Sequence, residues 1–193
     1  MQTITGMHQM SDWDLPGVAR ALDNAVTEEG ERLVNLVEDS PLLLVFLRQS
    51  GCTFCREAVA DIAKTREEIE WSGTRIVLVH MGDRRGIEEL LARHGLSSLD
   101  RICDASRSLY HAFGLKKGTW RQLFGFKVWV RGILAGVFGG HGLGRPKADP
   151  KQMPGVFFID RGLIARAYRH RSAADRPCYA ALCSRGDLHK EDF

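Results

Sequence analysis

The stretch PLLLVFLRQSGCTFCREAVADIA, residues 41–63, decides the fold. Residues 42–47 are an unbroken apolar run, which is typical of a strand that is buried on both faces of a sheet. A polar turn with a glycine follows, and from Thr53 onward good helix formers place apolar side chains on one face. Two cysteines, Cys52 and Cys55, therefore lie where a buried strand gives way to a helix.

The start of a helix is a favourable position for a thiolate. The first backbone N–H groups have no acceptor within the helix, and the helix dipole is positive at this end, so a thiol pKa falls below its usual value of about 8.5. Arg48 and Arg56 add positive charge, and Thr53 at the helix start is a further supporting residue. The three-residue spacing lets one of Cys52 and Cys55 attack a substrate while the other resolves the mixed disulfide.

Two other interpretations of this cysteine pair stay open, namely half of a zinc site and a pair of inert buried thiols. A zinc site needs a second, closely spaced ligand pair, whereas Cys178 and Cys183 are five residues apart in a different setting. We therefore favour redox chemistry without a bound metal. No phosphate-binding loop, dinucleotide fingerprint or nucleophile elbow is present, so we expect no cofactor.

Three segments in a fixed order resemble the thioredoxin superfamily and, more narrowly, the peroxiredoxin-like AhpC/TSA family, close to the selenoprotein-L-related redox proteins. They are the strand–CxxC–helix unit, RICD at 101–104 with LYHAFGL at 109–115, and QMPGVFFIDRG at 152–162. The resemblance covers roughly residues 22–184. It implies an α/β thioredoxin-like fold, a central mixed sheet flanked by helices, with an insertion at about 116–148 before a late hairpin.

The resemblance also implies a role for Met153 and Pro154, because thioredoxin-like proteins have a cis-proline here that lies against the CxxC and offers backbone groups to a docked substrate. The peroxiredoxin pattern Pro-x-x-x-Thr/Ser-x-x-Cys fits only in part. When the pattern is aligned on Cys55, Arg48 stands at the position of its proline and Cys52 at the position of its Thr or Ser. This favours dithiol–disulfide chemistry with Cys52 as the attacking thiol. A peroxiredoxin-like scheme would have Cys55 attack instead, and the sequence leaves the choice open.

Composition and charge fit an ordinary globular protein. The chain has 193 residues, 44% of them hydrophobic, and a net charge of +3, which gives no reason to expect a nucleic-acid partner. The five cysteines are an odd number, and neither a secretory signal nor an apolar run of membrane-spanning length is visible, so we expect a cytoplasmic protein. Its electrons would come from a dithiol protein or glutathione and pass to a disulfide or peroxide substrate.

We divide the chain into an N-terminal arm or short helix, residues 1–21, and a thioredoxin-like domain, residues 22–193. A small hairpin is expected at 26–34, although residues 33–39 could instead form a short helix. Hydrophobic periodicity predicts the other elements. The expected strands are 42–47, 75–80, 102–103, 155–159 and 163–168, and the expected helices are 53–70, 87–94, 106–113 and 172–182.

The insertion at 116–148 contains no acidic residue and mixes basic, aromatic and glycine residues. We favour a cap over the active site or a surface that pairs two copies in a homodimer. The alternative is a helix that lies on an anionic membrane surface. If the thiols are inert, the same segment would make the chain a redox-inactive binding module.

The remaining titratable residues have simpler explanations. His80 ends a core strand near the expected site, and a packed, hydrogen-bonded histidine is favoured there over a proton acceptor. Cys103, Cys178 and Cys183 are expected to be buried, unreactive thiols, because free cysteine is among the most buried residue types.

Overall fold

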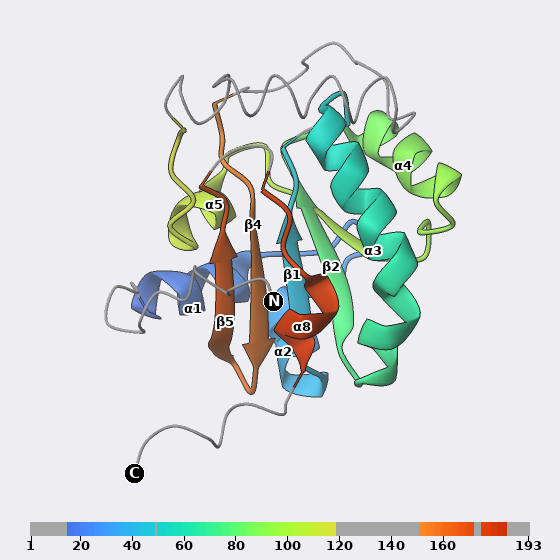
Figure 1. Ribbon diagram of the computed structural model, residues 1–193. Helices are drawn as coiled ribbons and strands as arrows, with labels where there is room; N and C mark the ends of the chain where they lie inside the picture. The colour runs from blue at the N-terminus through green and yellow to red at the C-terminus, as the bar shows by residue number, and fades with distance from the viewer. Residues whose placement is uncertain (1–14, 49, 119–150, 172–174, 185–193) are drawn as a thin grey trace.

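The computed structural model describes residues 15–48, 50–118, 151–171 and 175–184. Within these ranges one mixed sheet has the strand order β3-β2-β1-β4-β5 (Figure 1). The strands are β1 (Leu42–Phe46), β2 (Arg75–His80), β3 (Asp100–Cys103), β4 (Gly155–Asp160) and β5 (Leu163–Arg169). The helices are α1 (Leu15–Asn24), α2 (Leu33–Asp39), α3 (Thr53–Trp71), α4 (Arg84–Arg93), α5 (Ser108–Ala112) and α8 (Tyr179–Cys183).

Strand β1 is the centre of the sheet, as its apolar run predicts. It pairs in parallel with β2 and antiparallel with β4. Alternate side chains of a strand point to opposite faces, and here both faces are buried, because residues 42–47 are each at most 2% exposed. The parallel β1–α3–β2 unit and the antiparallel β4–β5 hairpin confirm the predicted α/β thioredoxin-like architecture.

Helices cover both faces of the sheet (Figure 1). Leu42, Leu44 and Phe46 pack in a core with residues of α1, α2 and α5. Leu43 and Val45 pack on the other side in a core with residues of α3, α4 and α8. Helix α3 begins soon after β1 ends, so its first turn lies at the C-terminal ends of the parallel strands β1 and β2. This is where we expect the site.

The N-terminal part of the chain differs in detail from the prediction. Residues 15–24 form helix α1, and its Val18 and Leu22 are buried in the core. The expected hairpin is reduced to a single bridge between Val26 and Arg32, with Gly30 at a φ of 92° in the turn. The chain then enters α2, so a bridge from the predicted hairpin and the alternative short helix both occur.

The predicted closing helix at 172–182 is wrong at its start. Residues 175–178 are not helical, and α8 begins only at Tyr179. Pro177 disfavours a helical conformation for the residue before it. That residue, Arg176, reaches α3 and forms an ion pair with Glu57 at 2.7 Å and another with Asp61. The extended segment thus ties α8 to α3.

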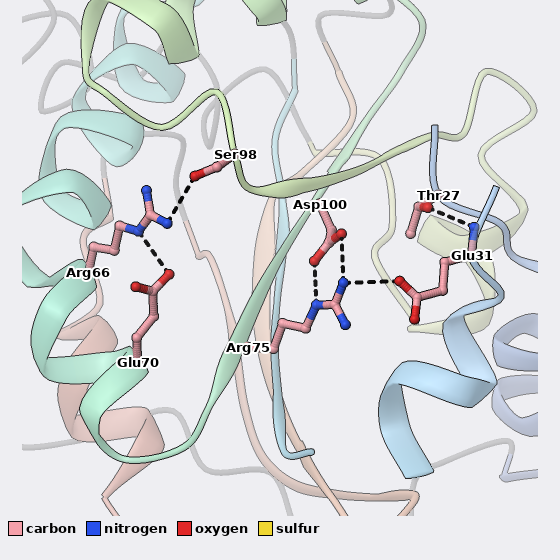
Figure 2. Close-up of polar contacts among 7 residues, drawn as sticks. All are labelled: Thr27, Glu31, Arg66, Glu70, Arg75, Ser98 and Asp100. Carbon is pink, nitrogen blue, oxygen red and sulfur yellow. Dashed lines mark hydrogen bonds and ion pairs between the residues drawn. The ribbon is translucent and has the colours of Figure 1, made fainter. Parts of the chain in front are cut away.

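Partly exposed ion pairs lie at the far end of the sheet (Figure 2). Arg75 at the start of β2 donates to both oxygens of Asp100 on β3, at 2.6 and 3.0 Å, and to Glu31 at 3.0 Å. Figure 2 also shows Arg66 of α3 bonded to Glu70 and Ser98. These contacts join β2 to β3, and α3 to the chain before β3, at the end of the sheet opposite the cysteines.

The base of the insertion closes by a bridge between Lys117 and Gln152, and Gly118 donates its N–H to the Lys151 carbonyl at 2.7 Å. The insertion from residue 119 onward lies outside the described residues, so its expected roles stay predictions. Among the helices that the structure describes, none has the length and apolar character needed to cross a membrane.

Candidate functional site

The two cysteines lie at the expected junction. Strand β1 ends at Phe46, and Cys52 is the N-cap residue of α3 with an extended backbone (φ −80°, ψ 122°). Its carbonyl accepts the N–H groups of Cys55 and Arg56 at 3.0 and 3.1 Å, which starts the helix. Cys52 is partly exposed and Cys55 is buried, and both are free thiols rather than a disulfide.

The pKa of Cys52 is lowered from its ordinary value to about 6. A hydrogen bond from the Cys55 side chain is the largest cause of this lower pKa, followed by the positive charge of Arg48 and the backbone N–H groups of Cys55 and Phe54, while burial opposes them. The Nη1 atom of Arg48 is 3.8 Å from the Cys52 sulfur. These donors favour a thiolate on Cys52 at neutral pH.

Cys55 lies beneath Cys52 and is only 3% exposed. Its sulfur accepts the backbone N–H of Arg48 at 3.2 Å. Arg48 therefore contacts both thiols, Cys52 through its guanidinium and Cys55 through its backbone. A partly exposed, acidic thiol in front of a buried one is the arrangement that sequential thiol–disulfide exchange requires.

The other predicted support residues have different surroundings. Thr53 is the first residue of α3 and is buried. Arg56 donates from Nε to the Ser50 carbonyl at 2.9 Å and so fixes the loop before the helix. Ser50 also hydrogen-bonds to Asp83, which precedes α4. Arg56 thus acts on the loop, and it is not among the causes that lower the pKa of Cys52.

Pro154 lies near Cys55, but its predicted cis peptide bond is wrong. Pro154 and Cys55 line the same cavity, whereas the Met153–Pro154 bond is trans. A trans proline can open a strand without loss of a ladder hydrogen bond, and β4 begins at the next residue, Gly155. Met153 is buried and donates its N–H to the Lys116 carbonyl at 3.3 Å.

The cavity behind Cys55 has about 20 Å³ of free space, which is enough for one water molecule. Its wall includes Arg48, His170 and Tyr179. Burial lowers the pKa of His170 to about 4, so its imidazole is neutral at pH 7. His170 and Tyr179 were missed from the sequence, because each reaches the cavity from an element far along the chain.

His80 matches the packed alternative. It is 1% exposed, and its Nε2 is 3.0 Å from Glu28, which also pairs with Arg84 and Arg101. Burial is the main cause that lowers the His80 pKa. The histidine belongs to an ion-pair cluster at the β3 edge and does not line the cavity beside Cys55.

The three remaining cysteines were all expected to be buried, and this is correct only for Cys183. Cys103 and Cys178 are exposed, because they lie at the end of an edge strand and before a short helix. Burial raises the pKa of Cys183 to about 12. Within the described part of the chain, no group of three or more His, Cys, Asp or Glu side chains is arranged to hold a metal ion.

Comparisons with known proteins show the family and the fold. A family model described as AhpC/TSA antioxidant enzyme matches residues 61–174, more than half of the chain, and begins six residues after Cys55. Prostamide/prostaglandin F synthase of Salmo salar is 32% identical over 111 residues, which are 57% of this chain and 54% of that protein. The match thus spans about half the length of this relative.

Two solved structures show the same fold. A cysteine-to-serine mutant of peroxiredoxin Q from Xanthomonas campestris superimposes with a TM-score of 0.55 at 15% identity, over 78% of this chain and 83% of that chain. The MTB dsbF structure, in mixed oxidized and reduced forms, has a TM-score of 0.53 at 14% identity, over 86% and 92% of the two chains.

Proposed function

Because the chain belongs to the AhpC/TSA antioxidant enzyme family, we propose that it is a thiol-dependent oxidoreductase that reduces disulfides through Cys52 and Cys55. The observation that carries the proposal is the contrast between the two thiols. Cys52 is partly exposed with a pKa of about 6, and Cys55 is buried behind it. Since the family match begins after both cysteines, their assignment depends on this geometry.

In the proposed reaction the Cys52 thiolate attacks one sulfur of the substrate disulfide. A Cys52–substrate disulfide forms, and the other substrate sulfur leaves as a thiolate that takes a proton. Cys55 then loses its proton and attacks the Cys52 sulfur, which releases the second substrate thiol. The substrate gains two electrons and two protons, and the protein is left with a Cys52–Cys55 disulfide.

Arg48 has two functions in this scheme. Its guanidinium stabilises the Cys52 thiolate before attack, and its backbone N–H stabilises negative charge on the Cys55 sulfur when that thiol loses its proton. The cycle closes when a dithiol protein or glutathione reduces the Cys52–Cys55 disulfide. No bound cofactor is needed.

Peroxide reduction is a second candidate reaction for the same thiols, because the family is described as antioxidant enzymes. The Cys52 thiolate would attack one peroxide oxygen, the O–O bond would break, and the other oxygen would leave as an alcohol or water after protonation. Cys55 would then condense with the Cys52 sulfenic acid and release water. This scheme gives the attack to Cys52, whereas the peroxiredoxin-like alignment gives it to Cys55.

A further candidate activity is the one in the name of the curated relatives, prostaglandin F formation. The similarity supports it over about half of their length. An assay for that product on the wild-type chain and on Cys52→Ser tests it. Formation that depends on Cys52 would support this activity, and an inactive wild-type chain would exclude it.

The decisive experiment measures insulin-disulfide reduction and peroxide consumption side by side on the reduced protein. We expect Cys52→Ser and the Cys52→Ser/Cys55→Ser double variant to lose all turnover. Cys55→Ser should stop after one attack, with a stable mixed disulfide on Cys52. The control is Cys178→Ser, which should retain full activity. Undiminished turnover in the double variant would overturn the proposal.

A further inference from the structure

We infer that Tyr110 is a positioning residue for the dithiol, because it holds the Leu47–Arg48 peptide so that its N–H faces the Cys55 sulfur. The inference rests on the proposed role of Cys55 as the resolving thiol. Tyr110 is on α5, on the other side of the sheet from α3, and it takes no part in the bond changes of the reaction scheme above.

Two hydrogen bonds hold the Leu47–Arg48 peptide unit, one at its carbonyl and one at its N–H. The buried Tyr110 hydroxyl donates to the Leu47 carbonyl and lies 3.1 Å from the Val79 carbonyl. The N–H of the same Leu47–Arg48 peptide is the donor to the Cys55 sulfur at 3.2 Å. Tyr110 and Cys55 thus hold the two ends of a single planar group.

A peptide unit is rigid, so its carbonyl cannot turn without its N–H. A donor on the carbonyl also polarises the peptide and strengthens the N–H as a donor. The Leu47 N–H still donates to the Val79 carbonyl at 2.8 Å, and the Leu47–Arg48 peptide follows directly after this bond to β2. The phenol therefore sets both the direction and the strength of the N–H···S contact that stabilises negative charge on Cys55.

The phenol is itself held on all sides. Phe46 packs edge-on against it, with ring centroids 4.9 Å apart. The first turn of α5 is fixed by Asp104, whose carboxylate accepts the N–H groups of Ser108 and Leu109 at 3.0 and 2.8 Å. Burial raises the pKa of Tyr110 well above its usual range, so the hydroxyl keeps its proton and remains a donor.

The test separates the two thiols by stopped-flow reaction with 5,5′-dithiobis(2-nitrobenzoate), in a Cys103→Ser/Cys178→Ser background without the exposed thiols. Attack by Cys52 releases one thionitrobenzoate, and closure of the Cys52–Cys55 disulfide releases the second. In Tyr110→Phe we expect the first phase to keep its rate. The second phase should slow about tenfold at pH 7, with its pH midpoint shifted upward by about one unit.

Two comparisons keep this test decisive. Tyr168→Phe, which removes a hydroxyl from the edge strand β5, should leave both phases unchanged. Asp104→Asn, which weakens the hydrogen bonds at the start of α5, should also slow the second phase, but by less than Tyr110→Phe. If both folded variants retain the wild-type second phase and its pH midpoint, the inference is wrong. Absence of a fast first phase in the wild-type chain would instead contradict the proposed function.

Discussion

The start of helix α3 and the end of helix α8 place cysteines in opposite electrostatic settings. Both helices have a cysteine as N-cap residue, Cys52 and Cys178, and each has a buried cysteine further on. In α8 that residue is Cys183, whose pKa burial raises to about 12 and whose thiol donates to the Tyr179 carbonyl at 3.5 Å. In α3 the Cys52 sulfur faces a guanidinium and donors, and its pKa falls to about 6.

Burial alone does not separate these thiols, because both Cys52 and Cys183 lose water on folding. The difference lies in what replaces the water. At Cys52 the hydrogen bond from the Cys55 side chain is the largest cause and outweighs burial. At Cys183 burial is the largest cause, and it outweighs the Thr74 hydrogen bond and the Arg166 charge, which both lower the pKa. A CxxC sequence is therefore reactive only where the fold also supplies donors, and the following measurements test this.

The largest expected effect is the selectivity of alkylation. At pH 7 a thiol with a pKa of about 6 is about nine-tenths thiolate, whereas one with a pKa of about 12 is ionised to about one part in 10⁵. Iodoacetamide should therefore modify Cys52 at least about a thousandfold faster than Cys183. Peptide-level mass spectrometry measures both rates. In urea the two rates should converge, and similar rates in the folded chain would contradict the contrast.

The next effect concerns His170, in the wall of the cavity that α3 and α8 share. Because folding lowers its pKa from 6.5 to about 4, the unfolded chain takes up this proton first. The contribution of neutral His170 to the free energy of unfolding is fully present above pH 6.5. It is lost as the pH falls from 6.5 toward 4, which reduces the free energy of unfolding by about 2 to 3 kcal/mol.

Urea unfolding at pH 7 and pH 4.5 measures this loss. Asp175 opposes the low pKa of His170, and His80 adds a loss in the same direction, so His170→Gln should reduce the pH dependence without abolishing it. An identical pH dependence in wild type and His170→Gln would show that His170 is not the buried group responsible.

A smaller effect is expected at Arg48. Without its charge, Arg48→Gln should raise the Cys52 pKa by about one unit, which is about 1.4 kcal/mol of thiolate stabilisation. Arg48→Lys keeps the charge and should restore most of the difference. The pH dependence of Cys52 alkylation measures it. A glutamine variant that still titrates near pH 6 would leave the hydrogen bonds from the Cys55 side chain and from the backbone N–H groups as the whole cause.

The smallest effect separates stability from reactivity in α8. Cys183→Ala should reduce the free energy of unfolding by about 1 kcal/mol, because its buried sulfur is lost from the core, and leave disulfide reduction unchanged. Cys178→Ser is exposed and should change neither quantity. Loss of turnover in either variant would show that α8 takes part in the chemistry.

Local patterns predicted most of the fold. Strands at 42–47, 75–80, 155–159 and 163–168, and the helix at 53–70, all occur within one or two residues of the expected ends. Each is encoded by its own apolar run or helical periodicity and bounded by glycine or polar turns. The start of α8 was not predictable in this way, since Arg176 is held in an extended segment by carboxylates on a helix over a hundred residues earlier.

The candidate site was predicted in part. Arg48, Cys52 and Cys55 lie close together in sequence where β1 leads into α3, so their proximity follows from sequence spacing. Tyr110 and His170 were missed as site residues, because their contacts depend on the packing of elements across the sheet. Tyr110, for instance, bonds to a carbonyl 63 residues away. No local pattern encodes such a contact, and only the spatial arrangement shows it.

The most direct test is the pKa of Cys52 in the intact, reduced chain. The rate of iodoacetamide modification of this one residue, followed by peptide mass spectrometry from pH 4 to 10, gives that value without disturbing Cys55 or Arg48. Our account predicts an inflection near pH 6. An inflection near pH 8.5 or above, the range of an unactivated thiol, would contradict it.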